Sequence, residues 1–219
     1  MKVYIEGNIG SGKSTFVDKL SEYINNKKIN AKILKEPVEC WQNTKDKEGK
    51  NILEYYYEDQ QKYAFSFQMN AFISRCKEIK ELLEENYQYN FIERSVYTDR
   101  NVFMKFNYEL GNINEIEHTI YEQWFDFHCN HFDLEPSLFI YLKVDYNICD
   151  QRIKKRNRLG ESNIPLEYLK NIEDYHDKWL AEEKKKGIEV LEIDASINYL
   201  ENEKELEKVF ESIINYVQK

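Results

Sequence analysis

The sequence predicts an α/β fold in which a mostly parallel sheet of about five strands is flanked by helices on both faces. Short apolar runs of strand character alternate along the chain with segments in which apolar residues recur every three or four positions. Right-handed crossovers join such alternating elements and produce a parallel sheet. A glycine-rich loop directly follows the first apolar run, which places a phosphate-binding turn at a strand end.

Five segments are predicted as strands because each is short, apolar and bounded by polar or turn-forming residues. They are residues 3–5, 31–36, 90–93, 138–144 and 189–194. The carboxyl ends of parallel strands share one edge of the sheet, where ligands bind in such folds. The segments that follow these strands should therefore converge on one site.

Composition indicates a globular protein of one domain over residues 1–219. Hydrophobic residues make up 42% of the chain and aromatic residues 15%, so a full core can form. The formal net charge of −9 argues against nucleic acid or an anionic membrane as the main partner, because both require a basic face. We therefore expect chemistry on a small molecule.

The expected location is the cytoplasm. The first strand begins near residue 2, which leaves no room for a leader peptide, and no apolar run approaches membrane-spanning length.

Residues 7–15 match the phosphate-binding pattern G-x-x-x-x-G-K-[ST]. The loop consists of Gly7, Asn8, Ile9, Gly10, Ser11, Gly12, Lys13, Ser14 and Thr15. In this motif backbone N–H groups surround the phosphates, the lysine reaches the outer phosphates, and the serine hydroxyl ligates Mg²⁺. The loop predicts a bound nucleoside triphosphate with Mg²⁺ but leaves open whether the chain is a kinase, a switch or a motor.

Charged residues follow the second and third predicted strands. Glu36 lies where a general base belongs in a kinase, although a surface glutamate is the alternative. Glu93 could hold Mg²⁺ directly or through water, and Arg94 could contact the transferred phosphate. A structural ion pair with Asp99 or Arg100 is an equally good interpretation of these two residues.

Two further segments complete the candidate site. A cationic run precedes a glycine and a proline, which favours a mobile lid over about residues 152–163, although such runs are more often solvated helix faces. A stretch dense in aromatic residues contains one amide. Most of these rings are expected in the core, but an amide among them could hydrogen-bond an acceptor that carries a planar base. The lid arginines are Arg152, Arg156 and Arg158, and the aromatic stretch includes Trp41, Tyr57, Phe67 and Gln68.

Taken together, these motifs resemble the eukaryotic-type deoxyribonucleoside kinases in order and spacing, from residue 3 to about residue 180. The motifs are residues 7–15, Glu36-Pro37-Val38 with Trp41, Phe67-Gln68, Glu93-Arg94-Ser95, Arg152-x-x-x-Arg156-x-Arg158 with Glu161, and residues 164–169. The resemblance implies a homodimer that transfers the γ-phosphate of ATP to the 5′-hydroxyl of a deoxynucleoside, in nucleotide salvage.

The resemblance also implies roles for individual residues. Glu36 corresponds to the general base, Glu93 to the carboxylate associated with magnesium, and Arg94 to the clamp on the 5′ side. Of the remaining residues, Gln68 would bind the base edge between Trp41 and Phe103, Tyr57 and Glu161 would hold the 3′-hydroxyl, and Arg156 and Arg158 would close the lid.

Three residues near the expected base pocket bear on acceptor choice. Ala71, Arg75 and Asp99 are similar to the residues of deoxycytidine and deoxyguanosine kinases, whereas thymidine-preferring members carry an uncharged residue in place of Asp99. A buried Arg75–Asp99 pair would fill space near the pyrimidine 5-position. The expected acceptors are purine deoxynucleosides or deoxycytidine rather than thymidine.

Two alternatives stay open. A nucleoside monophosphate kinase of the thymidylate type would use Arg75 or Arg94 to bind the phosphate of its acceptor. A GTP- or ATP-dependent regulatory protein is disfavoured, because Asp46-Lys47-Glu48-Gly49 does not follow a strand and no N-K-x-D sequence is present.

Overall fold

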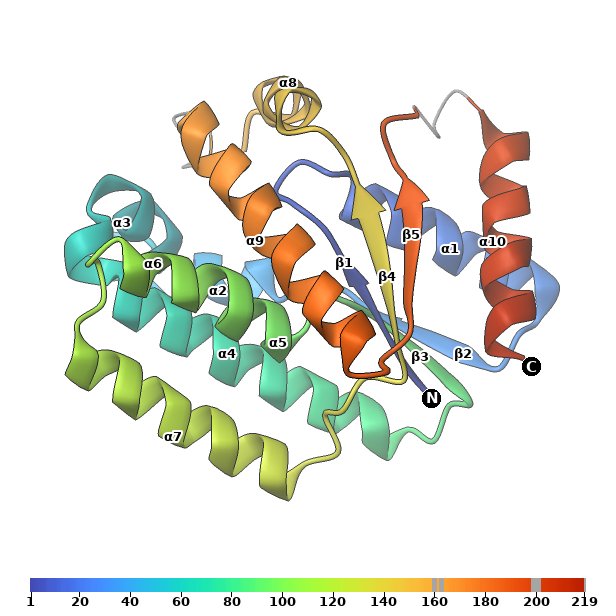
Figure 1. Ribbon diagram of the computed structural model, residues 1–219, viewed down its shortest axis with the longest axis horizontal. Helices are drawn as coiled ribbons and strands as arrows, with labels where there is room; N and C mark the ends of the chain where they lie inside the picture. Colours follow the sequence, from blue (N-terminus) through green and yellow to red (C-terminus); the bar gives the residue numbers. More distant parts are fainter. Residues whose placement is uncertain (159–160, 162–163, 198–201, 219) are drawn as a thin grey trace.

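A computed structural model describes residues 1–158, 161, 164–197 and 202–218. Its centre is a five-stranded sheet in which every neighbouring pair of strands is parallel, in the order β2-β3-β1-β4-β5 (Figure 1). The strands are β1 (Lys2–Glu6), β2 (Ala31–Leu34), β3 (Tyr89–Glu93), β4 (Leu138–Lys143) and β5 (Val190–Asp194). The predicted fold class is confirmed.

Strand β1 lies in the middle of the sheet, with β3 on one side and β4 on the other. Val3 is in register with both Phe91 and Leu138. The chain after β1 builds β2 and β3 on one side and then crosses over to build β4 and β5 on the other. Such a reversal of strand order creates a crevice at the carboxyl ends of the strands, and the loop after β1 lies beside it.

Helices cover both faces of the sheet. Figure 1 shows α1 and α10 together on one face, whereas α4, α7 and α9 lie on the other. The helices are α1 (Lys13–Lys27), α2 (Val38–Asn43), α3 (Ile52–Glu58), α4 (Gln60–Glu84), α5 (Val96–Thr98), the π-helical turn η1 (Asp99–Met104), α6 (Lys105–Glu109), α7 (Glu115–His131), α8 (Tyr146–Arg156), α9 (Leu166–Lys185) and α10 (Glu203–Val217).

The core is divided into two apolar layers by the sheet. Successive side chains of a strand point to opposite faces, so Val3 and Ile5 pack with α1 and α10 while Tyr4 packs with α4 and α9. All three side chains are completely buried, as expected for a parallel strand covered on both faces. This rigid centre holds the loops at the strand ends.

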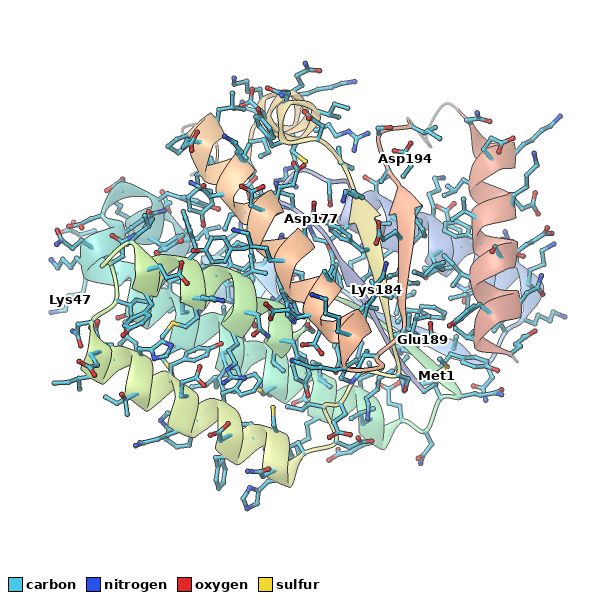
Figure 2. All side chains as sticks on the ribbon, in the orientation of Figure 1. Met1, Lys47, Asp177, Lys184, Glu189 and Asp194 are labelled. Carbon is cyan, nitrogen blue, oxygen red and sulfur yellow. The ribbon has the colours of Figure 1, made fainter. Side chains whose placement is uncertain are left out.

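The parallel strands all begin at one end of the sheet and finish at the other. Figure 2 shows Met1, which precedes β1, and Asp194, which ends β5, at opposite edges of the sheet. The glycine-rich loop and the residues after β2 and β3 all lie at the carboxyl edge, on the side of Asp194. Within the described part of the chain, no helix combines the length and apolar character needed to cross a bilayer.

Candidate active site

The glycine-rich loop connects β1 to α1, which begins at Lys13. Gly10 has φ +80°, and a Cβ atom there would lie 2.5 Å from the carbonyl oxygen of Cys149 in α8. Only glycine combines this left-handed conformation with so close an approach. The loop therefore packs directly on α8. The N-terminus of α1, whose free N–H groups favour anions, lies at the end of this loop.

Lys13 is buried beneath this loop. Its Nζ donates hydrogen bonds to the carbonyl oxygens of Gly7 at 3.0 Å and Asn8 at 2.7 Å. Burial, together with the charge of Arg94, lowers the pKa of Lys13 to about 7. The Asn8 side chain donates to the carbonyl oxygen of Leu169 at 2.8 Å, which ties the loop to α9.

A cavity of about 170 Å³ opens beside the loop. It is enclosed by the carboxyl ends of β2 and β3 and by α3, α4, η1 and the start of α9. The residues predicted for the site that line it are Ile9, Gly10, Gly12, Lys13, Ser14, Thr15, Glu36, Trp41, Tyr57, Phe67, Gln68, Ala71, Glu93, Arg94, Asp99, Phe103, Arg156, Arg158 and Glu161. The phosphate loop and the aromatic stretch thus share one cavity.

Glu36 lies between two arginines at the centre of this cavity. Its Oε1 forms an ion pair with Nε of Arg94 at 3.0 Å and accepts a hydrogen bond from Nη2 of Arg75 at 3.1 Å. Burial raises the pKa of Glu36, but the charges of Arg94, Arg75 and Lys13 outweigh this effect and leave the pKa below its ordinary value. The carboxylate is therefore ionised at neutral pH.

Arg75 links this carboxylate to Asp99. Nε and Nη2 of Arg75 donate to the two carboxylate oxygens of Asp99, at 2.8 and 3.3 Å. Its Nη1 donates to the carbonyl oxygen of Glu93 at 3.0 Å. Both partners of this ion pair are almost completely buried, and such bidentate pairs are geometrically specific. Arg75 itself lies behind the lining of the cavity.

Ser14 and Glu93 meet at the boundary between the loop and β3. The hydroxyl of Ser14 donates to Oε1 of Glu93 at 2.7 Å, and the backbone N–H of Glu36 points to Oε2 of Glu93 at 3.4 Å. The structural ion pair considered as an alternative is not present, because Asp99 pairs with Arg75 and Arg100 pairs with Glu122. Hydroxyl and carboxylate oxygens thus lie together near the phosphate loop.

The aromatic wall is formed by α2, α3 and α4. Trp41 packs edge to face on Phe67 with ring centroids 5.4 Å apart, and its Nε1 donates to the Ser74 hydroxyl at 2.9 Å. Gln68, on the same helix as Phe67, is only 1% exposed and presents an amide among these rings. On the other side, the Phe103 ring lies 4.8 Å from the guanidinium carbon of Arg94.

Sequence reasoning assigned no role in the site to two tyrosines that line the cavity, although Tyr56 lies in the aromatic stretch that the sequence singled out. Tyr56 and Tyr168 line the cavity, and their hydroxyls are 3.0 Å apart. Asn107 donates to the Tyr56 hydroxyl at 3.1 Å, so three separate segments meet there. Tyr168 follows Pro165 within a motif that the sequence did single out, but nothing in the sequence indicates that its side chain points inwards.

The arginines of the cationic segment after β4 contact two different parts of the protein. Arg156 and Arg158 both contact Glu161, and Arg158 Nη1 lies 3.1 Å from Oε1 of Glu161. Of the lid predicted over residues 152–163, residues 159–160 and 162–163 lie outside the described residues. Arg152 instead donates to the carbonyl oxygens of Ser11, Ala195 and Ser196.

Arg152 lines a second hollow on the other side of the loop. This hollow is bordered by Gly10–Gly12 of the loop, by α8 and by Ala195 after β5. Arg152 is hydrogen-bonded to both the phosphate loop and the segment after β5, so it connects two walls of this hollow. The glycine-rich loop therefore lies between two openings.

The chain matches a known protein family over nearly all of its length. A family model described as deoxynucleoside kinase matches residues 3–218. The chain belongs to the deoxynucleoside kinase family. It is therefore a nucleoside kinase that transfers phosphate, and the resemblance noted in its motifs is confirmed.

Curated relatives cover most of the chain. Deoxycytidine kinase 2 of Gallus gallus is 34% identical over 99% of this chain and 90% of its own length. Deoxycytidine kinase of Homo sapiens is 37% identical over 82% of this chain and 75% of its own length. A mitochondrial deoxyguanosine kinase of Xenopus laevis is 32% identical over 82% of this kinase and 73% of its own length.

Proposed function

We propose that this kinase phosphorylates the 5′-hydroxyl of purine deoxynucleosides or deoxycytidine in preference to thymidine, with ATP as donor, for nucleotide salvage. The observation that carries the proposal is the buried pair of Arg75 and Asp99 at a cavity with aromatic walls, which Asp99 lines. The charged pair leaves little space beside Ala71 for the 5-methyl group of thymine. Relatives named deoxycytidine and deoxyguanosine kinase are consistent with this choice.

In the proposed reaction, Glu36 is the general base. Its carboxylate is ionised at neutral pH, lines the cavity, and lies on the same side of the sheet as Lys13. A base of this kind accepts the proton of the attacking hydroxyl as the phosphoryl group is transferred. Arg94 would clamp the acceptor oxygen and the transferred phosphate, and Lys13 would bind the outer phosphates.

Magnesium fits the oxygen atoms at the loop. Mg²⁺ prefers oxygen ligands and keeps several waters when it binds a nucleotide, and the Ser14 hydroxyl and the Glu93 carboxylate are adjacent. We assign these two residues to the metal, Ser14 as a ligand and Glu93 directly or through water. The ion would neutralise charge on the phosphates.

The acceptor would lie against the aromatic wall. Gln68 offers a donor and an acceptor to the base edge, with Trp41 and Phe103 on either side of the ring. Tyr57 and Glu161 would hold the 3′-hydroxyl of the sugar. Because Arg156 and Arg158 both contact Glu161, the lid arginines and the sugar site are connected.

The proposed homodimer is supported by an apolar stripe on α7. Ile116, Ile120, Trp124 and Phe127 are exposed and recur at helical spacing along one side of this helix. Figure 1 shows α7 at the outside of the molecule, beyond α4. Contiguous exposed apolar surface marks an interface, and a second copy of this single-domain chain is its proposed occupant.

A substrate panel tests the proposal. With ATP and Mg²⁺, the four deoxynucleosides and their four 5′-monophosphates are each offered as acceptors, and ADP formation is measured under steady-state conditions. We expect activity with deoxynucleosides, with the highest kcat/KM for a purine deoxynucleoside or deoxycytidine. Phosphorylation of monophosphates alone would identify a nucleoside monophosphate kinase instead. A highest kcat/KM with thymidine would contradict the assigned preference.

A further inference from the structure

Glu6 ends β1 with a carboxylate that is completely buried. A buried carboxylate is costly unless it accepts hydrogen bonds, and Oγ1 of Thr98 donates one to Oε2 of Glu6. Thr98 is also completely buried. Glu6 does not line the active-site cavity, and none of the roles proposed above involves it.

Thr98 belongs to the short turn that follows β3. Its backbone N–H donates to the Ser95 hydroxyl at 3.1 Å, which closes the first turn of α5. Ser95 directly follows Arg94 in the chain. The Glu6 carboxylate therefore holds the far side of a turn whose first residue is Arg94.

Arg94 has an unusual backbone at this turn. Its φ angle is +64°, a left-handed conformation that is sterically unfavourable for a residue other than glycine. Such a conformation persists only where the surroundings fix it. The Arg94 backbone N–H donates to the carbonyl oxygen of Ile5 at 2.9 Å. Consecutive residues of β1 thus hold both sides of the strained position, Ile5 through its backbone and Glu6 through its side chain.

The direction of the Arg94 side chain depends on this turn. From the left-handed position the guanidinium reaches Oε1 of Glu36 at 3.0 Å and lies over the Phe103 ring. A change in the backbone angles of Arg94 would carry its guanidinium away from both partners. We propose that Glu6 is a positioning residue, whose hydrogen bond from Thr98 fixes the turn that aims Arg94 at the reacting hydroxyl. The inference rests on the role proposed for Arg94.

A matched pair of variants tests this role. Thr98→Val keeps the shape of the side chain and removes the hydroxyl, whereas Thr98→Ser keeps the hydroxyl. We expect Thr98→Val to lower kcat about tenfold with little change in KM for ATP, because small displacements of a catalytic group reduce rate strongly. Thr98→Ser should stay within about twofold of the wild type. An unchanged kcat in Thr98→Val would overturn the proposal.

A double-mutant cycle separates positioning from general stability. In an Arg94→Lys background the turn no longer presents the guanidinium, so Thr98→Val should lower the residual kcat by less than about twofold. An equal loss in both backgrounds would mean that the Glu6–Thr98 contact acts elsewhere, and would overturn the proposal. Full activity of Arg94→Lys would instead contradict the role proposed for Arg94, and the inference with it.

Glu6→Gln provides a second route if Thr98→Val does not fold. The amide keeps the volume and an acceptor oxygen for Thr98 but places an NH2 group where the second carboxyl oxygen has no hydrogen-bond partner, which weakens the contact. We expect a loss of kcat of about threefold that again disappears in the Arg94→Lys background. A loss that persists there would count against Glu6 as a positioning residue.

Discussion

Nε of Arg94 lies 3.0 Å from Oε1 of Glu36, and both side chains line the same cavity. The pair joins the carboxyl ends of β2 and β3, which are neighbours in the sheet. A cation in direct contact keeps the carboxylate charged, as a general base requires. The same contact places the two groups proposed to act on the acceptor hydroxyl side by side.

Replacing the proposed base should abolish most activity. We expect Glu36→Gln to lower kcat roughly a hundredfold or more, because general-base catalysis contributes about that factor. Steady-state assays with deoxycytidine and with deoxyguanosine measure the effect. Glu39→Gln, an exposed carboxylate three residues further along, is the control and should retain wild-type kcat. Near-normal turnover of Glu36→Gln would remove Glu36 from the mechanism.

Acceptor choice should change when the buried ion pair is removed. We expect Arg75→Met with Asp99→Ala to shift the ratio of kcat/KM towards thymidine, because Asp99 lines the cavity and is paired with Arg75. Arg75→Met alone leaves Asp99 buried without its partner, which typically costs about 3–5 kcal/mol. The single variant should therefore unfold at a lower temperature than the double variant. An unchanged substrate ranking in the double variant would refute this basis for selectivity.

Stability should depend on pH through Lys13. The folded-state pKa of Lys13 is about 7, against 10.5 for the free side chain, chiefly because of burial. Between these values the unfolded chain binds a proton that the folded chain does not, so this contribution to stability rises as pH increases. We expect the free energy of unfolding of the wild type to increase from pH 7 to pH 9 relative to Lys13→Met. The free energies of unfolding are measured by urea titration in nucleotide-free buffer. Equal changes with pH in the wild type and in Lys13→Met would contradict the prediction.

Gly10 and Gly49 form a matched pair for the phosphate loop. Both have positive φ angles, +80° and +88°, but a Cβ atom meets Cys149 at 2.5 Å in the first case and nothing within 4 Å in the second. Gly10→Ala should raise KM for ATP and lower the melting temperature more than Gly49→Ala, which carries only the backbone cost. Equal effects of the two variants would show that contact with α8 does not shape the loop.

The apolar stripe on α7 should control assembly. We expect the double variant Ile120→Glu and Trp124→Glu to sediment as a monomer where the wild type sediments as a dimer, because charges cannot be buried unpaired at an interface. Leu166→Glu, on exposed surface of α9, is the control and should leave the oligomer intact. A wild-type monomer at micromolar concentration would contradict the proposed homodimer.

Much of the fold follows from local sequence patterns. Apolar runs predicted all five strands, and the glycine-rich loop predicted where α1 begins, because both depend on neighbours in the chain. Glu36 and Glu93 were located by the same logic, since Glu36 follows β2 and Glu93 ends β3. The parallel direction of neighbouring strands also agrees with the alternation of strands and helices, because helical crossovers join parallel strands.

Side-chain contacts between residues far apart in the sequence could not be predicted from local patterns. The contact of Ser14 with Glu93 and that of Arg75 with Glu36 each join distant segments, and which charges pair depends on packing in three dimensions. Nothing local distinguishes Arg94 as left-handed either, and the backbone hydrogen bond from this residue goes to Ile5 of β1, far away in the sequence. Sequence patterns thus proposed the residues of the candidate site, whereas the structure is needed to say which of them lie together.

The position of β2 at one edge of the sheet limits how copies of the protein can associate. An edge strand leaves backbone groups unpaired, and these invite strand-to-strand association. Here the edge is only four residues long, and Lys32 and Lys35 lie within and directly after it. Short length and lysines are the features by which proteins discourage such pairing. Association of two chains through β2 is therefore discouraged, in keeping with the contact between helices proposed for the homodimer.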